Sequence, residues 1–335
     1  MLAVDTIITL ELGHYRLREQ IASSAYGVVW RASGPRGTRD VALKLVNQEQ
    51  MARAQPEQQV RWCISAHNEI AFLQSLEPWD ERHIVRLLDS GQHQGLPVLA
   101  LELIPCDLGQ HVRALGDGRA PPLAQVLDWV AQLNQALAKV HQYGWRYLDL
   151  KPANVLLDVH RNRVKLADFG TNLPLAELAP HPYAGTANWQ APEQFFPTPQ
   201  GGYATAARSD YFALGALFYY LVAGGTTLRF GASCGRAMRD HQSGAAALLR
   251  RRYGGALPPT LDNAEEVLFL QKIDQGLAAA GGGHRPTSAG ACHDAALALL
   301  RRLLAPAPGD RPGHAVEISR MLATITACLP VRGTP

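Results

Sequence analysis

Four polar residues that stand close together in the chain could handle a phosphoryl group. Asp149, Lys151 and Asn154 lie on the segment DLKPAN, and Asp168 opens a DFG tripeptide shortly after it. A carboxylate can orient a hydroxyl group, an ammonium group can neutralise a phosphoryl group, and amide and carboxylate oxygens are ligands for Mg²⁺. A chance polar loop between strands is the alternative, but the order and spacing of these residues favour phosphoryl transfer.

The pairing of DLKPxN with DFG resembles the catalytic and metal-binding loops of eukaryotic-like (Hanks-type) protein kinases. The resemblance implies that Asp149 accepts a hydrogen bond from the substrate hydroxyl and that Lys151 neutralises the moving phosphoryl group. It implies ATP as the phosphoryl donor. It also implies that Asn154 and Asp168 bind Mg²⁺, with Mn²⁺ as a second ion that such a site accepts.

Two further features of the sequence indicate the Ser/Thr class of these kinases. Lys151 stands two residues after Asp149, where tyrosine kinases usually carry Ala or Arg nearby. Gly185-Thr186 precedes Ala191-Pro192-Glu193, as in Ser/Thr kinases. The resemblance implies that Thr186 forms hydrogen bonds toward Asp149 and Lys151.

The phosphate-binding loop of the family has a degenerate counterpart here. Small residues in a strand–turn–strand let backbone N–H groups close over phosphates. The family pattern is GxGxxGxV, but residues 22–29 read ASSAYGVV, so Ala22 and Ser24 replace two glycines and only Gly27 remains. Close approach of the backbone to phosphate is harder without glycine, which favours weaker ATP binding.

Lys44 and Glu69 form a second implied pair. Lys44 ends the run VALK, and Glu69 lies in a helical pattern further along. A lone Lys in a strand is usually solvated and a helical Glu is usually on the surface. Their order ahead of DLKPAN argues against both readings. The resemblance implies that Lys44 holds the α- and β-phosphates and pairs with Glu69.

The resemblance also implies which residues contact the adenine and the ribose of ATP. Val29, Ala42 and Leu156 are implied to enclose the adenine, and Leu101 is implied to be the gatekeeper residue. The other contacts are polar. Backbone groups of Glu102 and Leu103 are implied to bind the edge of the base, and the carboxylate of Asp107 is implied to bind the ribose.

The pattern of elements is that of a small β-rich part followed by a helical part. Strand-like runs occupy residues 15–18, 27–30, 40–46, 84–88 and 96–104. One helical run occupies residues 58–76 and ends before Pro78. The remainder is mainly helical, with helices predicted over 123–143 and 210–222 and a flexible loop over 278–283. Asp210 is implied to anchor the catalytic loop, and Glu193 to form a buried ion pair with Arg311.

Together with the family resemblance, these patterns imply an α+β, two-lobed protein-kinase fold that makes one domain of residues 1–335. The N-lobe, residues 15–103, is β-rich with one main helix. The C-lobe, residues 104–325, is mostly helical. A hinge is expected over 102–106, and the region of about 228–293 is longer than a minimal kinase requires.

The bulk composition excludes several other classes of protein. Apolar residues make up 47% and charged residues 18% of 335 residues, as in a folded protein. A net charge of +3 gives no case for nucleic acid or an acidic membrane as a partner. The five scattered cysteines favour a reducing cytoplasm, and the longest apolar run, 211–225, is too short for a comfortable membrane span. The start of the chain lacks the basic region of a signal peptide. Richness in Ala, Leu, Arg and Gly favours a bacterial origin.

The sequence departs from the family where activating phosphates bind. The usual His-Arg-Asp is Tyr147-Leu148-Asp149, Leu173 replaces a second basic position, and residues 171–190 contain no Lys or Arg. A phosphate there would find no cation within the segment. The chain therefore resembles the non-RD subgroup, whose activation segment we expect to be ordered by packing.

Three readings of function remain after these observations. The first is a cytoplasmic Ser/Thr protein kinase that acts on a protein substrate. The second is a pseudokinase scaffold, which the degenerate loop suggests and the intact catalytic residues oppose. The third is a small-molecule kinase of the aminoglycoside type, disfavoured by Lys151, Arg311 and residues 191–193. The triplet Arg250–Arg252 is either a solvated face or a docking site for an acidic substrate or regulator.

Overall fold

The chain folds into two compact units. The computed structural model describes residues 2–24, 27–37, 39–116, 118–279 and 286–329. Residues 1–105 and 165–172 form the first unit, and residues 106–164 and 173–335 form the second. The chain thus leaves the first unit within the predicted hinge, residues 102–106. Residues 165–172, which the sequence placed in the C-lobe, group with the first unit.

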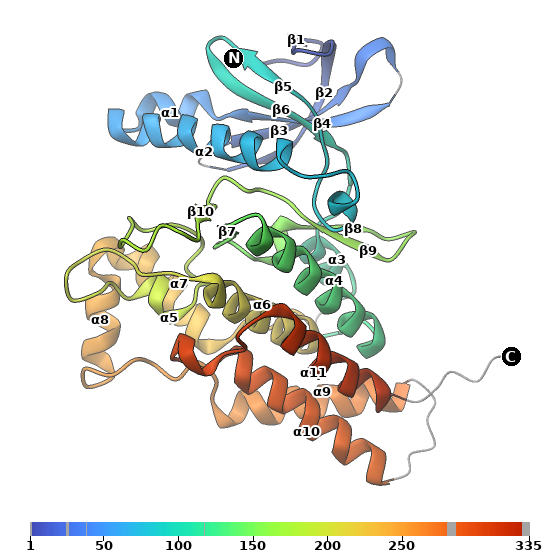
Figure 1. Ribbon diagram of the computed structural model, residues 1–335, viewed down its shortest axis with the longest axis vertical. Helices are drawn as coiled ribbons and strands as arrows, with labels where there is room; N and C mark the ends of the chain where they lie inside the picture. The colour runs from blue at the N-terminus through green and yellow to red at the C-terminus, as the bar shows by residue number, and fades with distance from the viewer. Residues whose placement is uncertain (1, 25–26, 38, 117, 280–285, 330–335) are drawn as a thin grey trace, which may run out of the picture. The chain divides into compact units, whose positions relative to one another are not determined.

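The first unit is built on a six-stranded antiparallel sheet (Figure 1). Its spatial order is β1-β2-β3-β4-β6-β5, with strands Ile7–Thr9, His14–Ser23, Gly27–Ser33, Asp40–Val46, Leu96–Glu102 and Leu87–His93. Two helices accompany it, α1 (Gln48–Arg53) and α2 (Pro56–Gln74), and α2 packs against β4, β5 and β6. Pro56 at the first helical position suits the start of α2, because the N–H that proline lacks would have no helical partner there.

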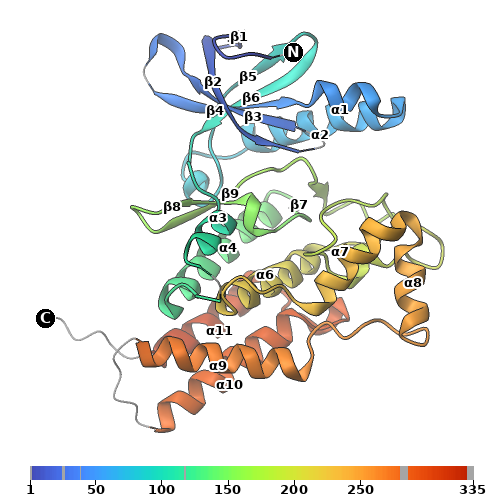
Figure 2. The same cartoon turned by 180° about the vertical axis from the view of Figure 1, so that it is seen from behind.

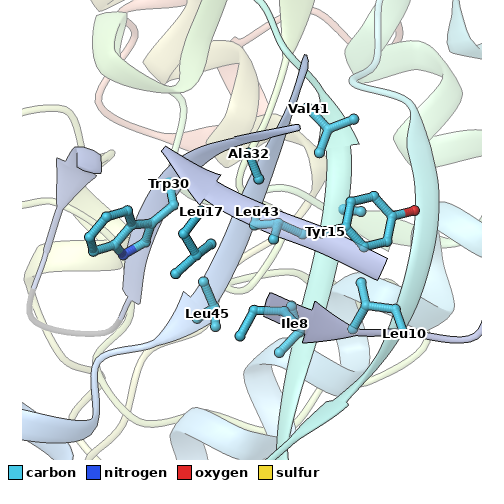
Figure 3. Close-up of a cluster of buried hydrophobic side chains, with 11 residues drawn as sticks. Ile8, Leu10, Tyr15, Leu17, Trp30, Ala32, Val41, Leu43 and Leu45 are labelled. Atoms are coloured by element: carbon cyan, nitrogen blue, oxygen red, sulfur yellow. The ribbon is translucent and has the colours of Figure 1, made fainter. Parts of the chain in front are cut away.

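One face of this sheet holds the core of the unit (Figure 3). Trp30 and Ala32 of β3 pair with Leu43 and Val41 of β4, and all four are buried. Since successive side chains of a strand point to opposite faces, the residues between them lie on the other face of the sheet. That second face therefore carries Val29, Ala42 and Lys44.

The structure corrects several predicted elements of the first unit. The predicted strand over 84–88 is wrong at its start, because Ile84 and Val85 pair with Leu166 and β5 begins only at Leu87. The one main helix that was predicted is α2, and the structure adds a second helix, α1, ahead of it. Helix α1 is short and polar, and Asn47 caps it by accepting a hydrogen bond from the N–H of Gln50 (3.2 Å). Ile64 of α2 is 52% exposed although it is apolar.

The second unit is mainly helical (Figures 1 and 2). Its helices are α3 (Leu108–Ala114), α4 (Leu123–Gln142), α5 (Pro192–Phe195), α6 (Ala207–Val222), α7 (Arg229–His241), α8 (Ala245–Arg252), α9 (Asn263–Ala279), α10 (Pro286–Leu303) and α11 (Ala315–Ala327). Short strands accompany them: β7 (Trp145–Arg146), β8 (Val155–Asp158), β9 (Arg163–Leu166, whose last two residues belong to the first unit) and β10 (Leu173–Pro174). Helix α9 extends to Ala279, which corrects the first part of the loop predicted over 278–283, and 280–283 lie outside the described residues.

Helix α6 includes the helix predicted over 210–222 and is the most buried helix of the second unit. Every side chain from Ser209 to Val222 is buried, and α6 packs against α4, α9 and α10. The predicted ion pair nearby is confirmed. Arg311 Nη1 lies 2.6 Å from Glu193 Oε1, and Arg311 Nη2 lies 2.9 Å from Glu193 Oε2. Among the helices that the structure describes, none is long and apolar enough to cross a bilayer.

Candidate active site

Three charged side chains of the first unit meet in one cluster. Lys44 of β4 donates to Glu69 of α2 (Nζ–Oε2 2.5 Å) and to Asp168 (Nζ–Oδ1 2.8 Å). Strand β4 and helix α2 supply the first two because they pack against each other. Glu69 is 1% exposed, whereas the Asp168 side chain is 47% exposed. Glu69 is thus the buried anchor of Lys44, and Asp168 is the accessible member.

The charges in this cluster keep Lys44 protonated. Burial acts to lower the pKa of its ammonium group, but the carboxylates of Asp168 and then Glu69 outweigh burial, so the pKa of Lys44 is raised. For the carboxyl group of Glu69, burial acts in the other direction and raises the pKa, and the charge of Lys44 opposes that rise. Glu69 also accepts the N–H of Phe169 (3.2 Å), which ties α2 to the DFG tripeptide.

The sheet brings five of the predicted nucleotide-binding residues to one face. Val29 pairs with Ala22 and with Lys44, and Ala42 pairs with Leu101. Paired residues of antiparallel strands point to the same side, so these side chains lie on the face opposite the core of Figure 3. An apolar surface with one ammonium group suits a flat base followed by phosphates.

The loop between β2 and β3 is closed by a serine. Ser24 Oγ accepts the N–H of Gly27 (3.1 Å), and Ser24 N–H donates to the Gly27 carbonyl (2.8 Å). Ala25 and Tyr26 lie outside the described residues. Gly27 was predicted to contact phosphate, and its N–H is bonded here to a hydroxyl of the chain itself.

Replacing Ala22 and Ser24 by glycine is expected to lower the KM for ATP. The change frees the Gly27 N–H and removes the Cβ atoms that keep phosphate away from the backbone, at a stability cost of about 0.4–1 kcal/mol for each added glycine. Initial rates measured over a range of ATP concentrations test this. Ser33→Gly, in the same sheet, is the control and should leave the KM unchanged. An unchanged or higher KM in the loop variant would contradict the prediction.

The structure narrows the predicted role of Glu102. Its N–H donates to the Arg86 carbonyl (3.0 Å), and its carboxylate accepts from Lys165 and from the Arg86 N–H. The N–H of Glu102 therefore serves the fold of the first unit. Leu103 follows the end of β6, and its contact with a base edge stays a prediction.

Three side chains of the second unit form hydrogen bonds around the carboxylate of Asp149. Its Oδ2 accepts from Lys151 Nζ (2.7 Å) and Asn154 Nδ2 (3.0 Å), and its Oδ1 accepts from Thr186 Oγ1 (2.7 Å). Lys151 also donates to Thr186 Oγ1 (2.8 Å). Asp149 is buried, so these bonds fix its carboxylate in one orientation.

The backbone next to Asp149 is held in a strained conformation. Leu148 has a φ of 66°, a value that a branched residue rarely adopts. The fully buried Asp210 accepts the N–H of Tyr147 (2.8 Å) and of Leu148 (2.7 Å), and His141 Nε2 lies 2.8 Å from its carboxylate. These contacts stabilise the strained residue, and they confirm that Asp210 anchors this loop.

Asp107 has a local role that the sequence reasoning missed. It is the N-cap of α3: its side chain accepts the N–H of Gln110 (2.8 Å), and Gln110 Oε1 accepts the Asp107 N–H (3.2 Å). This capping box was readable as Asp followed three residues later by Gln. Leu156 forms a backbone bridge with Asp107, so the two predicted nucleotide contacts of the second unit are adjacent.

The donor atoms of Asn154 and Asp168 fit a hard divalent cation. Asn154 uses its amide nitrogen to bind Asp149, which leaves the amide oxygen as its ligand atom. In the first unit, the side chain of Asp168 is 47% exposed and also offers hard oxygen atoms. Mg²⁺ prefers such oxygen ligands and retains several waters.

Arg146 fixes the segment that follows DFG in a way that the sequence did not predict. It lies on β7, which pairs with β10, and its Nη1 donates to the Glu177 carbonyl (2.9 Å). Arg146 is 1% exposed, and burial lowers the pKa of its guanidinium. The segment that follows DFG is therefore bound by a cation from another part of the chain, and this cation contacts a backbone carbonyl.

Comparison with known proteins agrees with this geometry. A family model described as a protein kinase domain matches residues 15–322. The crystal structure of the PknI kinase domain from Mycobacterium tuberculosis, a double mutant, superimposes with a TM-score of 0.61 at 23% identity, covering 97% of this chain and 99% of that one. The chain belongs to the protein kinase domain family, so the predicted kinase fold and the Hanks-type resemblance are confirmed.

Individual relatives include a plant protein and a bacterial protein. Cyclin-dependent kinase F-1 of Oryza sativa subsp. japonica is 33% identical over 187 residues, which are 52% of this chain and 35% of that protein. Serine/threonine-protein kinase PknB of Mycobacterium leprae (strain TN) is 30% identical over 220 residues, 63% of this chain and 32% of that protein. The chain spans less than half the length of these curated relatives.

Proposed function

We propose that the protein is a Ser/Thr protein kinase that transfers the γ-phosphoryl group of ATP to a protein hydroxyl. The observation that carries the proposal is the cluster of Lys151, Asn154 and Thr186 around the buried carboxylate of Asp149. The Lys44–Glu69–Asp168 cluster of the first unit supports it. Both clusters consist of the residue types that phosphoryl transfer requires.

Each of these residues has a role that its contacts support. Asp149 accepts the hydrogen bond of the substrate hydroxyl and takes its proton as the oxygen bonds to phosphorus and the bond to ADP breaks. Lys151 neutralises charge on the moving phosphoryl group, and Lys44 orients the α- and β-phosphates. Asn154 and Asp168 are the residues that would hold Mg²⁺ or Mn²⁺, which would supply further positive charge to the phosphates.

Incubation of the purified chain with labelled ATP and Mg²⁺ tests the proposal. Label should appear on Ser or Thr of the chain itself or of a generic protein substrate such as casein. Nucleotide binding without any transfer would establish the pseudokinase scaffold instead. Transfer to an aminoglycoside but not to protein would establish a small-molecule kinase. We include a cytoplasmic location in the proposal, and the five unpaired cysteines support it.

We further propose that activity does not require phosphorylation of the activation segment, as in the non-RD subgroup. Neutral contacts fix the segment: Tyr183 donates to Gln190 Oε1 (2.6 Å), and His181 Nε2 lies 2.8 Å from Thr205 Oγ1. Arg146 is buried against the Glu177 carbonyl, so a phosphate could not meet it without rearrangement. These contacts order the segment without added charge.

Phosphatase-treated enzyme is therefore expected to start without a lag. Thr171→Ala and Tyr183→Phe should remain active, whereas Thr186→Ala should be impaired, because it removes the hydroxyl that Asp149 and Lys151 share. Progress curves of substrate phosphorylation measure this. A pronounced lag that Thr171→Ala or Tyr183→Phe abolishes would overturn the proposal.

The triplet Arg250–Arg252 is proposed as a docking site for an acidic protein segment. Arg250 lies over the ring of Phe196 (5.5 Å to its centroid), and Arg251 and Arg252 are exposed. Replacing Arg251 and Arg252 by Gln should raise the KM for an acidic peptide, most strongly at low salt. Arg161→Gln, at another exposed arginine, is the control. An unchanged KM would assign the triplet to a solvated face.

A further inference from the structure

Helix α7 carries two glycines against which one residue of the activation segment is seated. Gly231 and Gly235 are one turn apart, so they lie on the same face of α7, and both are buried. A Cβ added to Gly235 would lie 2.5 Å from Asn188 Cγ and nearer still to its Oδ1. A Cβ on Gly231 would lie 3.0 Å from the Asn188 carbonyl carbon and nearer to its oxygen. We call these two glycines the α7 notch.

The α7 notch is fixed by contacts that do not involve Asn188. Phe230 packs edge-on against Phe212 of α6, with ring centroids 5.8 Å apart. The N–H of Arg229 donates to Glu265 of α9 (2.7 Å), and the Arg229 side chain pairs with Asp262 (2.8 Å). Figure 2 shows α7 beside α8, which also packs against it. The helix therefore provides a rigid surface for the loop.

Asn188 lies two residues after Thr186 on a tight loop. The N–H of Trp189 donates to the Thr186 carbonyl (2.9 Å), so the two ends of this turn move together. The Trp189 ring packs edge-on against Tyr220 of α6, with centroids 5.3 Å apart. Displacement of Asn188 from the α7 notch would consequently displace Thr186 from Asp149 and Lys151.

We propose that Asn188 is a positioning residue whose seat in the α7 notch sets Thr186 against the carboxylate of Asp149. The inference rests on the proposed phosphotransfer function for its kinetic consequence, but its structural part does not. Misplacement of a reacting group by about 1 Å can cost on the order of 10²-fold in rate. The α7 notch should thus control transfer to the hydroxyl and leave nucleotide affinity unchanged.

Two kinds of substitution test the proposal: one adds a methyl group in the α7 notch, and the other removes the Asn188 side chain that this methyl group would meet. Gly235→Ala places a methyl group against the Asn188 side chain, which Asn188→Ala removes. Gly231→Ala places one against the Asn188 backbone carbonyl, which Asn188→Ala leaves in place. Gly244→Ala is the matched control, because its Cβ would meet nothing within 4 Å and its φ is −82°. Each variant is made in the full chain.

Three measurements are made on each variant. They are the hydrogen exchange rate of the Trp189 amide, kcat for casein phosphorylation, and the Kd for ATP. Gly235→Ala should speed exchange and lower kcat by at least about tenfold each, with the Kd unchanged. Adding Asn188→Ala should remove the loss that is due to the methyl group, so that the double variant has the exchange rate and kcat of Asn188→Ala alone. The same addition should not rescue Gly231→Ala, and Gly244→Ala should match the wild type.

Several outcomes would overturn the proposal. These are wild-type exchange and kcat in Gly235→Ala, failure of Asn188→Ala to rescue it, or equal losses in Gly244→Ala. If Gly235→Ala does not fold, the double variant decides, since it should fold and act like Asn188→Ala. A wild-type chain without phosphotransfer would reject the proposed function alone, and the exchange data would still decide the seating of Asn188.

Discussion

Replacing Asp149 by Asn is expected to reduce turnover by roughly 10²–10⁴-fold while the chain still folds. The amide retains an oxygen that can accept from Lys151 and Asn154 at the position of Oδ2. It loses the negative charge and the ability to take a proton from the substrate hydroxyl. Steady-state phosphorylation of a protein substrate, with thermal unfolding as the check on folding, measures the effect.

Asp168→Asn should cause a loss of similar size for a different reason. It removes a charge next to Lys44 and weakens the proposed metal site, so activity should recover in part at high Mg²⁺. Asp158→Asn, at an exposed pair with Arg161, is the control and should change turnover less than about twofold. Near wild-type activity in Asp149→Asn or Asp168→Asn would show that the site assignment is wrong.

Breaking the ion pair of Glu193 and Arg311 should destabilise the chain strongly. The Arg311 side chain is 0% exposed, and it also donates to the carbonyls of Ala305 (2.8 Å) and Pro306 (3.0 Å). Glu193→Gln leaves a buried guanidinium without a counter-charge, which typically costs about 3–5 kcal/mol. Denaturant unfolding of the wild type and the variant gives the difference in the free energy of unfolding.

The chain offers a matched pair with the opposite exposure. Arg301 binds Glu266 through two bonds of 2.7 Å each, but its side chain is 59% exposed. Glu266→Gln should therefore lower the free energy of unfolding by no more than about 1 kcal/mol, because water screens and replaces the contact. Equal losses of unfolding free energy in the two variants would show that burial does not explain the contribution of the Glu193–Arg311 pair to stability.

The sequence by itself determined the contacts that lie within a few residues of each other. Asp149, Lys151 and Asn154 are so close in the chain that one turn of backbone brings their side chains together. The apolar run of α6 was sufficient to predict a buried helix, since such a helix has no face to expose. The order of Lys44 and Glu69 predicted their pairing only through the family resemblance.

The tertiary structure alone decided contacts between elements distant in sequence. The seat of Asn188 against Gly235 depends on how α7 packs on α6 and α9, and glycine spacing in a helix does not specify its partner. The bond from Arg146 to Glu177 depends on the pairing of two-residue strands too short to show a pattern. The start of β5 likewise shifted to Leu87 because Ile84 and Val85 pair with Leu166. Local spacing limits what a side chain can reach, and packing selects which of those contacts forms.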